Sequence, residues 1–417
     1  MNPGLFDDHI YWIWLADRLG THSLAMPALL GLPGGARRLY DATPAEIKHD
    51  PGFPEFSDSQ IHKLSDKDLS RPREFLALTQ ASGGWVLTPS DPEYPDSLRR
   101  LAAPPAALYM QGRFADMAGS PHVAIVGSRK VTELGYRSAC ELARQLAEAG
   151  VCVVSGGAQG VDTAAHTGAA EGGGNTIMVL GCGLDYPYNA KNAGLRLMIK
   201  NRGALMSEYP PGSPPLGWHF PHRNRLIAAL SHAVVVGQAG LQSGALITAG
   251  LALEQGLPVY VLDQPESMPL SAGSLQVIED GGTPITRVDQ LLAPLANQFS
   301  IRLPDDPPPL LSHQEGAPHS PLRVADAGFT KENNDTVRSI APEKSKASSR
   351  KEPDLSDLSD GSLRIWGIIK AMPPGGFSLA DLEQAADLPP SELLSALTEL
   401  EIAGAIDSLP GKRFVVK

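Results

Sequence analysis

Residues 220–225 place several groups that can bind nucleic acid within one short segment. Phe220, Arg223, Asn224 and Arg225 lie there, at a point where a helix is expected to begin. Guanidinium groups match phosphate oxygens, and an aromatic ring can stack on a base. The segment therefore predicts contact with a nucleic-acid backbone. In the alternative interpretation, Arg223 and Arg225 form salt bridges that only stabilise the start of the helix.

Glycine-containing segments follow apolar runs at four other places, residues 127–129, 155–162, 181–183 and 237–244. Glycine lets a ligand approach the backbone closely, and backbone N–H groups at a helix start attract anions. Such loops gather along one rim of a parallel sheet. We therefore expect an anion-binding crevice there, although each loop taken alone could be a simple tight turn or cap.

The same loops exclude several familiar chemistries. The glycine spacing after Gly127 does not match the dinucleotide fingerprint, and no P-loop lysine is present, so neither NAD, FAD nor ATP is expected as a cofactor. Asp162, Asp185 and Glu208 could hold Mg²⁺ for a nuclease, but helix caps and loop hydrogen bonds are favoured. His166, four residues after Asp162, is expected to be a packing residue. No catalytic residue and no metal site are assigned.

The charge of the chain restricts how phosphate could be bound. The 417 residues exceed one hydrophobic core, so two or three domains are expected, and the formal net charge is −11. Residues 121–296 contain eleven lysines and arginines against thirteen acids. Phosphate binding must therefore be local and supported by backbone N–H groups.

The location of the protein is expected to be cytoplasmic. Cys140, Cys152 and Cys182 are scattered without metal-ligand spacing, which favours reduced thiols in the cytosol. The N-terminus shows no signal-peptide pattern, and no apolar run reaches the length of a membrane span, so no membrane partner is expected.

An alternation of short apolar runs and amphipathic segments predicts the central domain. Strands are expected at residues 122–126, 151–155, 176–180, 204–207, 233–236 and 259–262. Helical segments separate them, such as 136–149 with Leu142 and Leu146 one turn apart. This order predicts the α/β class, with a doubly wound parallel sheet of the extended Rossmann type.

The remaining segments predict a small domain on each side of this sheet. Residues 5–81 are expected to form a helical domain whose turn at 29–36 resembles a degenerate helix-hairpin-helix, and 82–296 the sheet domain. Residues 297–360 are rich in proline and charge and predict a disordered linker. Residues 361–417 predict a winged helix. Its expected recognition helix, 391–403, carries three glutamates and no basic residue, which favours a protein-interaction or dimer-regulating role over duplex reading.

Taken together, the motifs resemble those of one family. They occur in the order Gly127-Ser128-Arg129, residues 155–162, 181–185, 207–209, 220–225 and 243–249. This sequence resembles the DNA-processing protein A family (DprA, also called Smf) over about residues 5–296, with the winged-helix tail of many members. The resemblance implies a SAM-like N-terminal domain, single-stranded DNA binding, a homodimer, and transfer of incoming DNA to the RecA recombinase during natural transformation. It implies no catalytic activity.

The resemblance also implies which residues bind the strand. Side-chain contacts are expected from Arg129, Phe220, Arg223, Asn224 and Arg225. Loop contacts are expected from Gly127, Ser128, Gly156, Gly157, Gln159, Gly160, Gln242, Ser243 and Gly244. Gln159, Gln242 and Gln238 stand where the family commonly has arginine, lysine and glutamate. Two missing cations should weaken binding and flatten its salt dependence.

Two other functions remain open from the sequence. The same crevice could serve a nucleotide enzyme, such as an N-glycosidic nucleotide hydrolase. The glutamines would also suit an interaction protein whose DNA site has decayed.

Overall fold

The computed structural model describes most of the chain in two compact units, residues 1–313 and 314–417. The described residues are 5–21, 23–117, 119–187, 193–263, 271–310, 359–372, 377–386, 393, 396–397, 399–400, 405–409 and 413–416. The division into four segments at residues 81, 296 and 360 stays a prediction.

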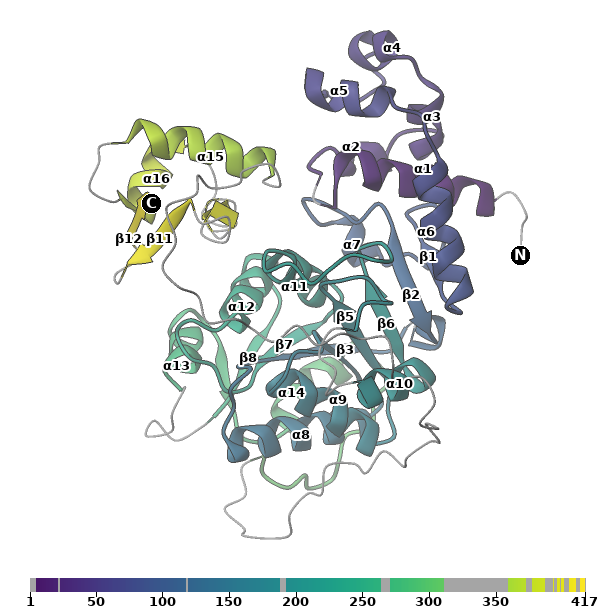
Figure 1. Cartoon of the computed structure of the whole chain (residues 1–417). Helices are drawn as coiled ribbons and strands as arrows, with labels where there is room; N and C mark the ends of the chain where they lie inside the picture. The colour runs from purple at the N-terminus through teal and green to yellow at the C-terminus, as the bar shows by residue number, and fades with distance from the viewer. Residues whose placement is uncertain are drawn as a thin grey trace, which may run out of the picture. The chain divides into compact units, whose positions relative to one another are not determined.

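A nine-stranded sheet forms the centre of the first unit, in the order β1-β2-β6-β5-β4-β3-β7-β8-β9 (Figure 1). The six predicted strands are present, each within one residue of its expected start. The parallel strands are β3 (His122–Val126), β4 (Cys152–Ser155), β5 (Thr176–Leu180), β6 (Ala204–Ser207), β7 (Ala233–Val236), β8 (Val259–Leu262) and β9 (Thr283–Ile285). The α/β doubly wound fold is therefore confirmed.

Two antiparallel strands extend the sheet beyond β6. β1 (Trp85–Leu87) pairs with β2 (Leu108–Gly112), and β2 pairs with β6. No strand was predicted at residues 85–87 or 108–112. Two short elements lie in the same part of the chain, α7 (Asp96–Arg99) and the 3-10 helix η1 (Phe114–Met117).

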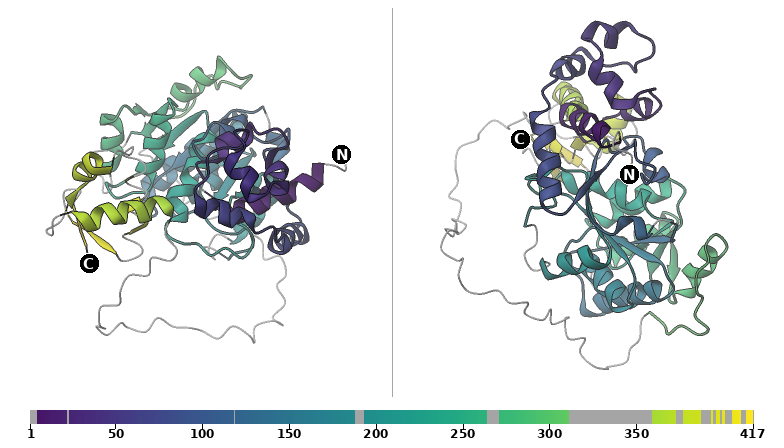
Figure 2. Two further views of the ribbon diagram at one scale, coloured as in Figure 1. Left: turned by 90° about the horizontal axis from the view of Figure 1, so that it is seen from above. Right: turned by 90° about the vertical axis from the view of Figure 1, so that its right-hand side faces the viewer.

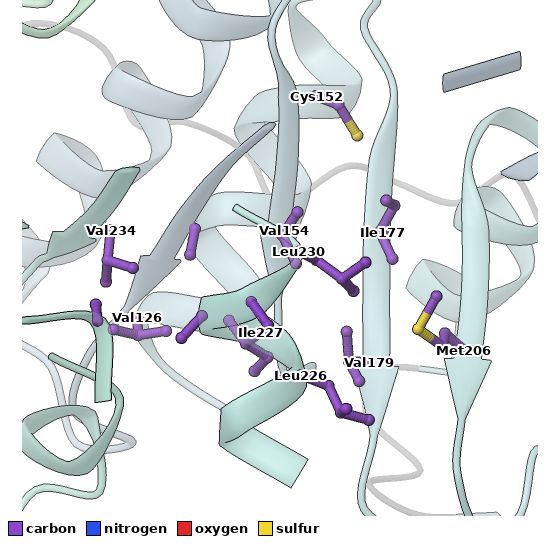
Figure 3. Packing of buried hydrophobic residues seen from close by; sticks show 14 of the residues in the cluster. Val126, Cys152, Val154, Ile177, Val179, Met206, Leu226, Ile227, Leu230 and Val234 are labelled. Atoms are coloured by element: carbon purple, nitrogen blue, oxygen red, sulfur yellow. The ribbon is translucent and has the colours of Figure 1, made fainter. Parts of the chain in front are cut away.

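Helices cover both faces of the sheet. α8 (Glu133–Glu148), α9 (Val161–Glu171) and α14 (Asp289–Ala296) contribute to the core on one face, and α11 (His219–Ala229) and α12 (Ala245–Glu254) to the core on the other. Figure 3 shows Leu226, Ile227 and Leu230 of the α11 segment beside the strand residues Val154 and Val179. α11 is thereby fixed on the sheet by buried apolar contacts. The remaining helices of the sheet region are α10 (Ala193–Arg202) and α13 (Ala272–Glu279).

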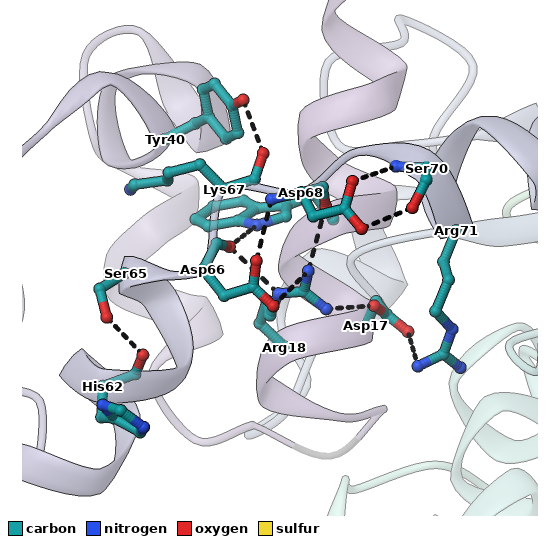
Figure 4. A network of polar contacts seen from close by, with 11 residues as sticks. Asp17, Arg18, Tyr40, His62, Ser65, Asp66, Lys67, Asp68, Ser70 and Arg71 are labelled. Carbon is teal, nitrogen blue, oxygen red and sulfur yellow. Dashed lines mark hydrogen bonds and ion pairs between the residues drawn. The ribbon is translucent and has the colours of Figure 1, made fainter.

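Six helices, α1 to α6, lie at the N-terminal end of the described part of the first unit, and Figure 2 shows this segment in purple and blue. They are α1 (Leu5–Leu19), α2 (Met26–Leu30), α3 (Gly35–Asp41), α4 (Pro44–His49), α5 (Asp58–Ser65) and α6 (Ser70–Ala81). Arg18 joins α1 to the segment before α6, because its guanidinium contacts Asp66 at 3.0 Å (Figure 4). It also contacts Asp17 of α1 at 2.6 Å. Ile13 of α1 shares a core cluster with Val86 and Tyr109 of the sheet, so the helices and the sheet pack together.

Residues 297–310 differ from the prediction of a linker. Leu310 is 3 % exposed and its backbone N–H donates to the Thr286 carbonyl. Leu310 also joins the core formed by α8, α9 and α14. A segment with few apolar residues can still pack when one of them reaches an existing core. The predicted linker is therefore wrong for 297–310, and its residues 311–358 lie outside the described residues.

The second unit has its own core and a small sheet. Its elements are α15 (Asp360–Ala371), β10 (Phe377–Ser378), α16 (Leu379–Ala386), β11 (Ile406–Leu409) and β12 (Arg413–Val416). The strands pair in the order β10-β12-β11, and β11 and β12 pair antiparallel. Most of the expected recognition helix at 391–403 lies outside the described residues. None of the helices in the described ranges is both long and apolar enough to cross a membrane.

Candidate nucleic-acid interface

The carboxyl edge of the sheet has a point where the strand order reverses. From β3 the chain continues to β4, β5 and β6 on one side, whereas β7, β8 and β9 continue on the other. The loops after β3 and β7 therefore lie side by side. In open α/β sheets, ligands bind outside the carboxyl ends of the strands at such a reversal.

Tight backbone contacts hold the first two glycine loops together. The Val161 N–H donates to the Ser128 carbonyl at 3.2 Å. Gly160 has a φ of 82°, and a Cβ there would collide with the carbonyl oxygens of Ser128 and Arg129. Glycine is thus required for both its conformation and its lack of a side chain. This contact brings the loop that carries Gln159 against the backbone of Ser128 and Arg129, and the Gln159 and Arg129 residues are both exposed.

Arg129 also lies over the ring of Phe220. Its guanidinium carbon is 5.2 Å from the ring centroid, and that of Arg223 is 5.8 Å away. These distances suit cation–π contacts. Phe220 is half-buried, with its ring next to Gly181 at the end of β5. The structure therefore brings together three of the predicted side chains from segments about 90 residues apart in sequence.

Arg223 is a buried residue that joins strand ends. Only 4 % of it is exposed, and its Nη1 donates to the carbonyls of Gly156, at 2.8 Å, and Val179. Burial raises the pKa of the nearby Asp162 carboxyl, and the positive charge of Arg223 opposes that rise. The expected contact of Arg223 with a phosphate would therefore compete with these hydrogen bonds to the backbone carbonyls. The contacts that Arg223 makes in the structure are structural ones.

Arg225 differs from its predicted place. It is 6 % exposed, its Nη2 contacts both carboxylate oxygens of Glu208 at 2.7 Å, and it donates to the Thr21 carbonyl at 3.0 Å. Helical residues two apart point about 200° away from each other, so Arg223 and Arg225 face different surroundings. The salt-bridge alternative is the one observed, and the prediction that Arg225 lines the strand site is corrected.

Asn224 and Gln238 hold the loops at the strand reversal. The Asn224 amide donates to the Gly244 carbonyl at 3.3 Å, which anchors the loop before α12. Gln238 is fully buried; its backbone oxygen accepts from Ser128 and its side-chain oxygen from the Thr132 N–H, each at 2.7 Å. These two residues therefore position the loops that carry Arg129, Gln242, Ser243 and Gly244.

Two features of this edge were missed by sequence reasoning. Lys130 is exposed beside Arg129, and its position next to a predicted site residue was the available signal. His219 stacks on Tyr209 with centroids 3.8 Å apart, and its Nδ1 lies 3.0 Å from the Gly181 carbonyl. Burial lowers the pKa of His219 to about 4. No sequence pattern pointed to that stacked pair.

The candidate catalytic groups are engaged in structural contacts. His166 is fully buried with Nδ1 2.8 Å from the Thr176 hydroxyl, and burial lowers its pKa to about 3. Asp162 accepts from the Ala158 N–H, and Asp185 accepts from the Gly212 N–H. Within the ranges that the structure describes, no three His, Cys, Asp or Glu side chains form a group that could hold a metal.

Known proteins share this architecture and much of the sequence. The family described as DNA recombination-mediator protein A matches residues 85–296, and the DprA winged helix domain matches 349–412. Protein Smf of a Synechocystis species is 33 % identical over 361 residues, covering 85 % of this chain and 86 % of that protein. Protein Smf of Escherichia coli is 39 % identical over 254 residues, 59 % of this chain and 66 % of that one.

A solved structure agrees with these sequence matches. The X-ray structure of DNA processing protein A from Streptococcus pneumoniae aligns with a TM-score of 0.59 at 31 % identity, covering 68 % of this chain and 97 % of that chain. One relative is thus matched over most of its length, and a family match spans half of the sequence. The chain belongs to the DNA-processing protein A (DprA/Smf) family.

Proposed function

We propose that this protein binds single-stranded DNA at the carboxyl edge of its sheet. The observation that carries the proposal is the Arg129–Phe220 pair at the strand reversal, with an exposed guanidinium 5.2 Å from a half-buried aromatic ring. The cation suits a phosphate and the ring suits a base. The names of the relatives as DNA processing proteins support the same choice.

The proposal extends to what happens to the bound strand. We infer that a homodimer protects incoming DNA and transfers it to the RecA recombinase during natural transformation. Support comes from the family description as a recombination mediator. The site residues are Arg129 and Phe220, with Gly127, Ser128, Gly156, Gly157, Gln159, Gly160, Gln242, Ser243 and Gly244 around them.

Fluorescence anisotropy with a labelled oligo-dT tests the binding step. Arg129→Ala should weaken binding by about tenfold, because a charge-assisted contact contributes about 1.5 kcal/mol. Arg113→Ala is the matched control, since Arg113 is exposed, follows β2, and lies at the opposite edge of the sheet. Equal oligo-dT affinities of the two variants would overturn the proposal that Arg129 lies in the DNA site.

An assay of RecA filament formation tests the transfer step separately. The protein should accelerate RecA filament formation on DNA covered by a single-strand-binding protein, and Arg129→Ala should remove that acceleration. Tight DNA binding without acceleration would reject the transfer and keep the binding site.

A further inference from the structure

The carboxyl edge of the sheet carries little positive charge. On the described loops at this edge, the exposed cations are Arg129 and Lys130, whereas Asp185 and Asp263 are exposed acids. These charges cancel in number. A surface that holds nucleic acid through many phosphates needs a local excess of lysine and arginine, and these loops do not supply it.

Other arginines near this edge are directed at the chain itself. Arg225 contacts Glu208, and Arg223 donates to the carbonyls of Gly156 and Val179. Arg196 donates to the Leu184 and Tyr186 carbonyls at 2.5 and 2.7 Å. These three guanidiniums stabilise the loops, and a phosphate would have to displace internal hydrogen bonds to reach them.

Amide and apolar groups occupy the exposed positions instead. Gln159 and Gln242 are exposed on the loops after β4 and β7. Leu241 is 63 % exposed beside Gln242, and Leu216, four residues before Phe220, is 40 % exposed. A glutamine amide places an NH2 donor group beside a carbonyl acceptor, which matches the edges of bases. Apolar and aromatic side chains match base faces.

From this composition we propose that the site holds the strand mainly by its bases. Phe220, Leu216 and Leu241 contact base faces, and Gln159 and Gln242 hydrogen-bond to base edges. Arg129 and Lys130 neutralise about two phosphates. The ligand class is then a single strand with unstacked, unpaired bases, and a duplex is rejected because its base faces are stacked and the Watson–Crick edges of its bases are paired. The inference rests on the proposed binding function.

An abasic oligonucleotide separates the two kinds of contact. It keeps every phosphate and removes every base. We expect oligo-dT to bind at least about tenfold more tightly than an abasic strand of equal length. The logarithm of affinity for dT should fall with the logarithm of salt concentration with a slope of about −1.4, which corresponds to about two phosphates on a single strand.

The failures of the two proposals look different in this experiment. Equal binding of both strands, with a slope of about −3 or steeper, would overturn the base-directed mode and keep the DNA-binding function. No measurable binding of either strand would reject the function itself.

Substitutions of the glutamines test base reading. The wild type should discriminate among dA, dC and dT homopolymers, and Gln159→Ala should reduce that discrimination without changing the salt slope. Gln159→Arg should instead steepen the slope by about 0.7, one phosphate. Gln80→Ala, at an exposed glutamine of α6, is the control and should change neither. Unchanged discrimination in Gln159→Ala and Gln242→Ala would remove both residues from the proposal.

The exposed leucines have one competing occupant, a second copy of the chain. Leu241→Ser should weaken oligo-dT binding severalfold and leave the sedimentation behaviour unchanged. Loss of self-association with unchanged DNA affinity would assign Leu241 to a contact between copies and overturn its place here.

Discussion

Arg225 and Arg129 carry the same group in different surroundings. The Arg225 side chain is 7 % exposed and its partner Glu208 is 3 % exposed, whereas Arg129 is exposed. Removing one member of a buried ion pair leaves an uncompensated charge and typically costs about 3–5 kcal/mol. Arg225→Met should therefore lower the free energy of unfolding by that amount, and Arg129→Met by less than about 0.5 kcal/mol.

Urea unfolding measures the difference in stability between Arg225→Met and Arg129→Met, and oligo-dT binding measures the DNA affinity of the same two variants. The double variant Arg225→Met/Glu208→Gln should recover part of the lost stability, because no charge then stays buried alone. If Arg225→Met kept its stability and lost DNA binding, Arg225 would belong to the strand site after all.

His166 makes stability depend on pH in a definite direction. Burial lowers its pKa to about 3 in the folded protein, whereas an unfolded histidine titrates near about 6.5. Between these values the unfolded chain binds a proton that the folded chain does not. Stability is therefore lost as pH falls below about 6.5, by about 1.4 kcal/mol per pH unit for this residue.

Urea unfolding at about pH 7.5 and about pH 5.5 checks this dependence. His166→Gln should reduce the pH dependence of the unfolding free energy by the contribution of one histidine. Burial also lowers the pKa of His219 to about 4, so His219 should account for part of the remaining pH dependence. His62→Gln, at an exposed position of α5, is the control. An unchanged pH dependence in His166→Gln would contradict the assignment of a buried neutral imidazole.

At the scale of elements, the parallel strands were predictable and the edge strands were not. Strands buried on both faces are short apolar runs, and β3, β4, β5 and β7 are followed directly by glycine, so the pattern located β3 to β8 within a residue. β1 has three residues, and its pairing with β2 depends on a partner distant in sequence. The segment 297–310 was misassigned for a related reason, since Leu310 packs on a core made elsewhere.

Within the site, loop composition located the edge of the sheet where we propose that DNA binds, but not the direction of each side chain. The strand ends had to meet at one edge, so the proximity of Arg129 to Phe220 followed from topology. Arg225 was misplaced although helical periodicity separates it from Arg223. Its acceptor Glu208 follows β6 and its acceptor Thr21 precedes α2. Such long-range partners leave no local pattern.

The contact between the first two glycine loops yields a prediction with a matched control. Gly160 and Gly150 both have positive φ, 82° and 86°, so alanine at either position costs about 1 kcal/mol of backbone strain. A Cβ at Gly160 collides with Ser128 and Arg129 oxygens, whereas a Cβ at Gly150 has nothing within 4 Å. Gly160→Ala should displace the Arg129 loop and weaken oligo-dT binding, and Gly150→Ala should not. Similar binding by the two variants would show that the contact does not position Arg129.

At the scale of the whole molecule, two separate cores explain how the chain is divided. The first unit buries its apolar residues around the nine-stranded sheet, and Ile365, Leu382 and Phe414 lie in the core of the second. A unit with its own core can stay folded when the chain between the units is cut. DNA binding is proposed for the first unit, so the function should persist there without the second.

Limited trypsin digestion tests this division. The stretch 311–358 contains Arg338, Lys344 and Lys351 and has the composition of a linker, so we expect the first cuts there. Two resistant fragments should appear, one ending after residue 310 and one beginning before residue 359, and the larger should bind oligo-dT within about twofold of the intact protein. Early cleavage inside the sheet unit would contradict its compactness. A large loss of affinity in the resistant N-terminal fragment would instead show that the tail contributes to DNA binding, against the acidic character of residues 391–403.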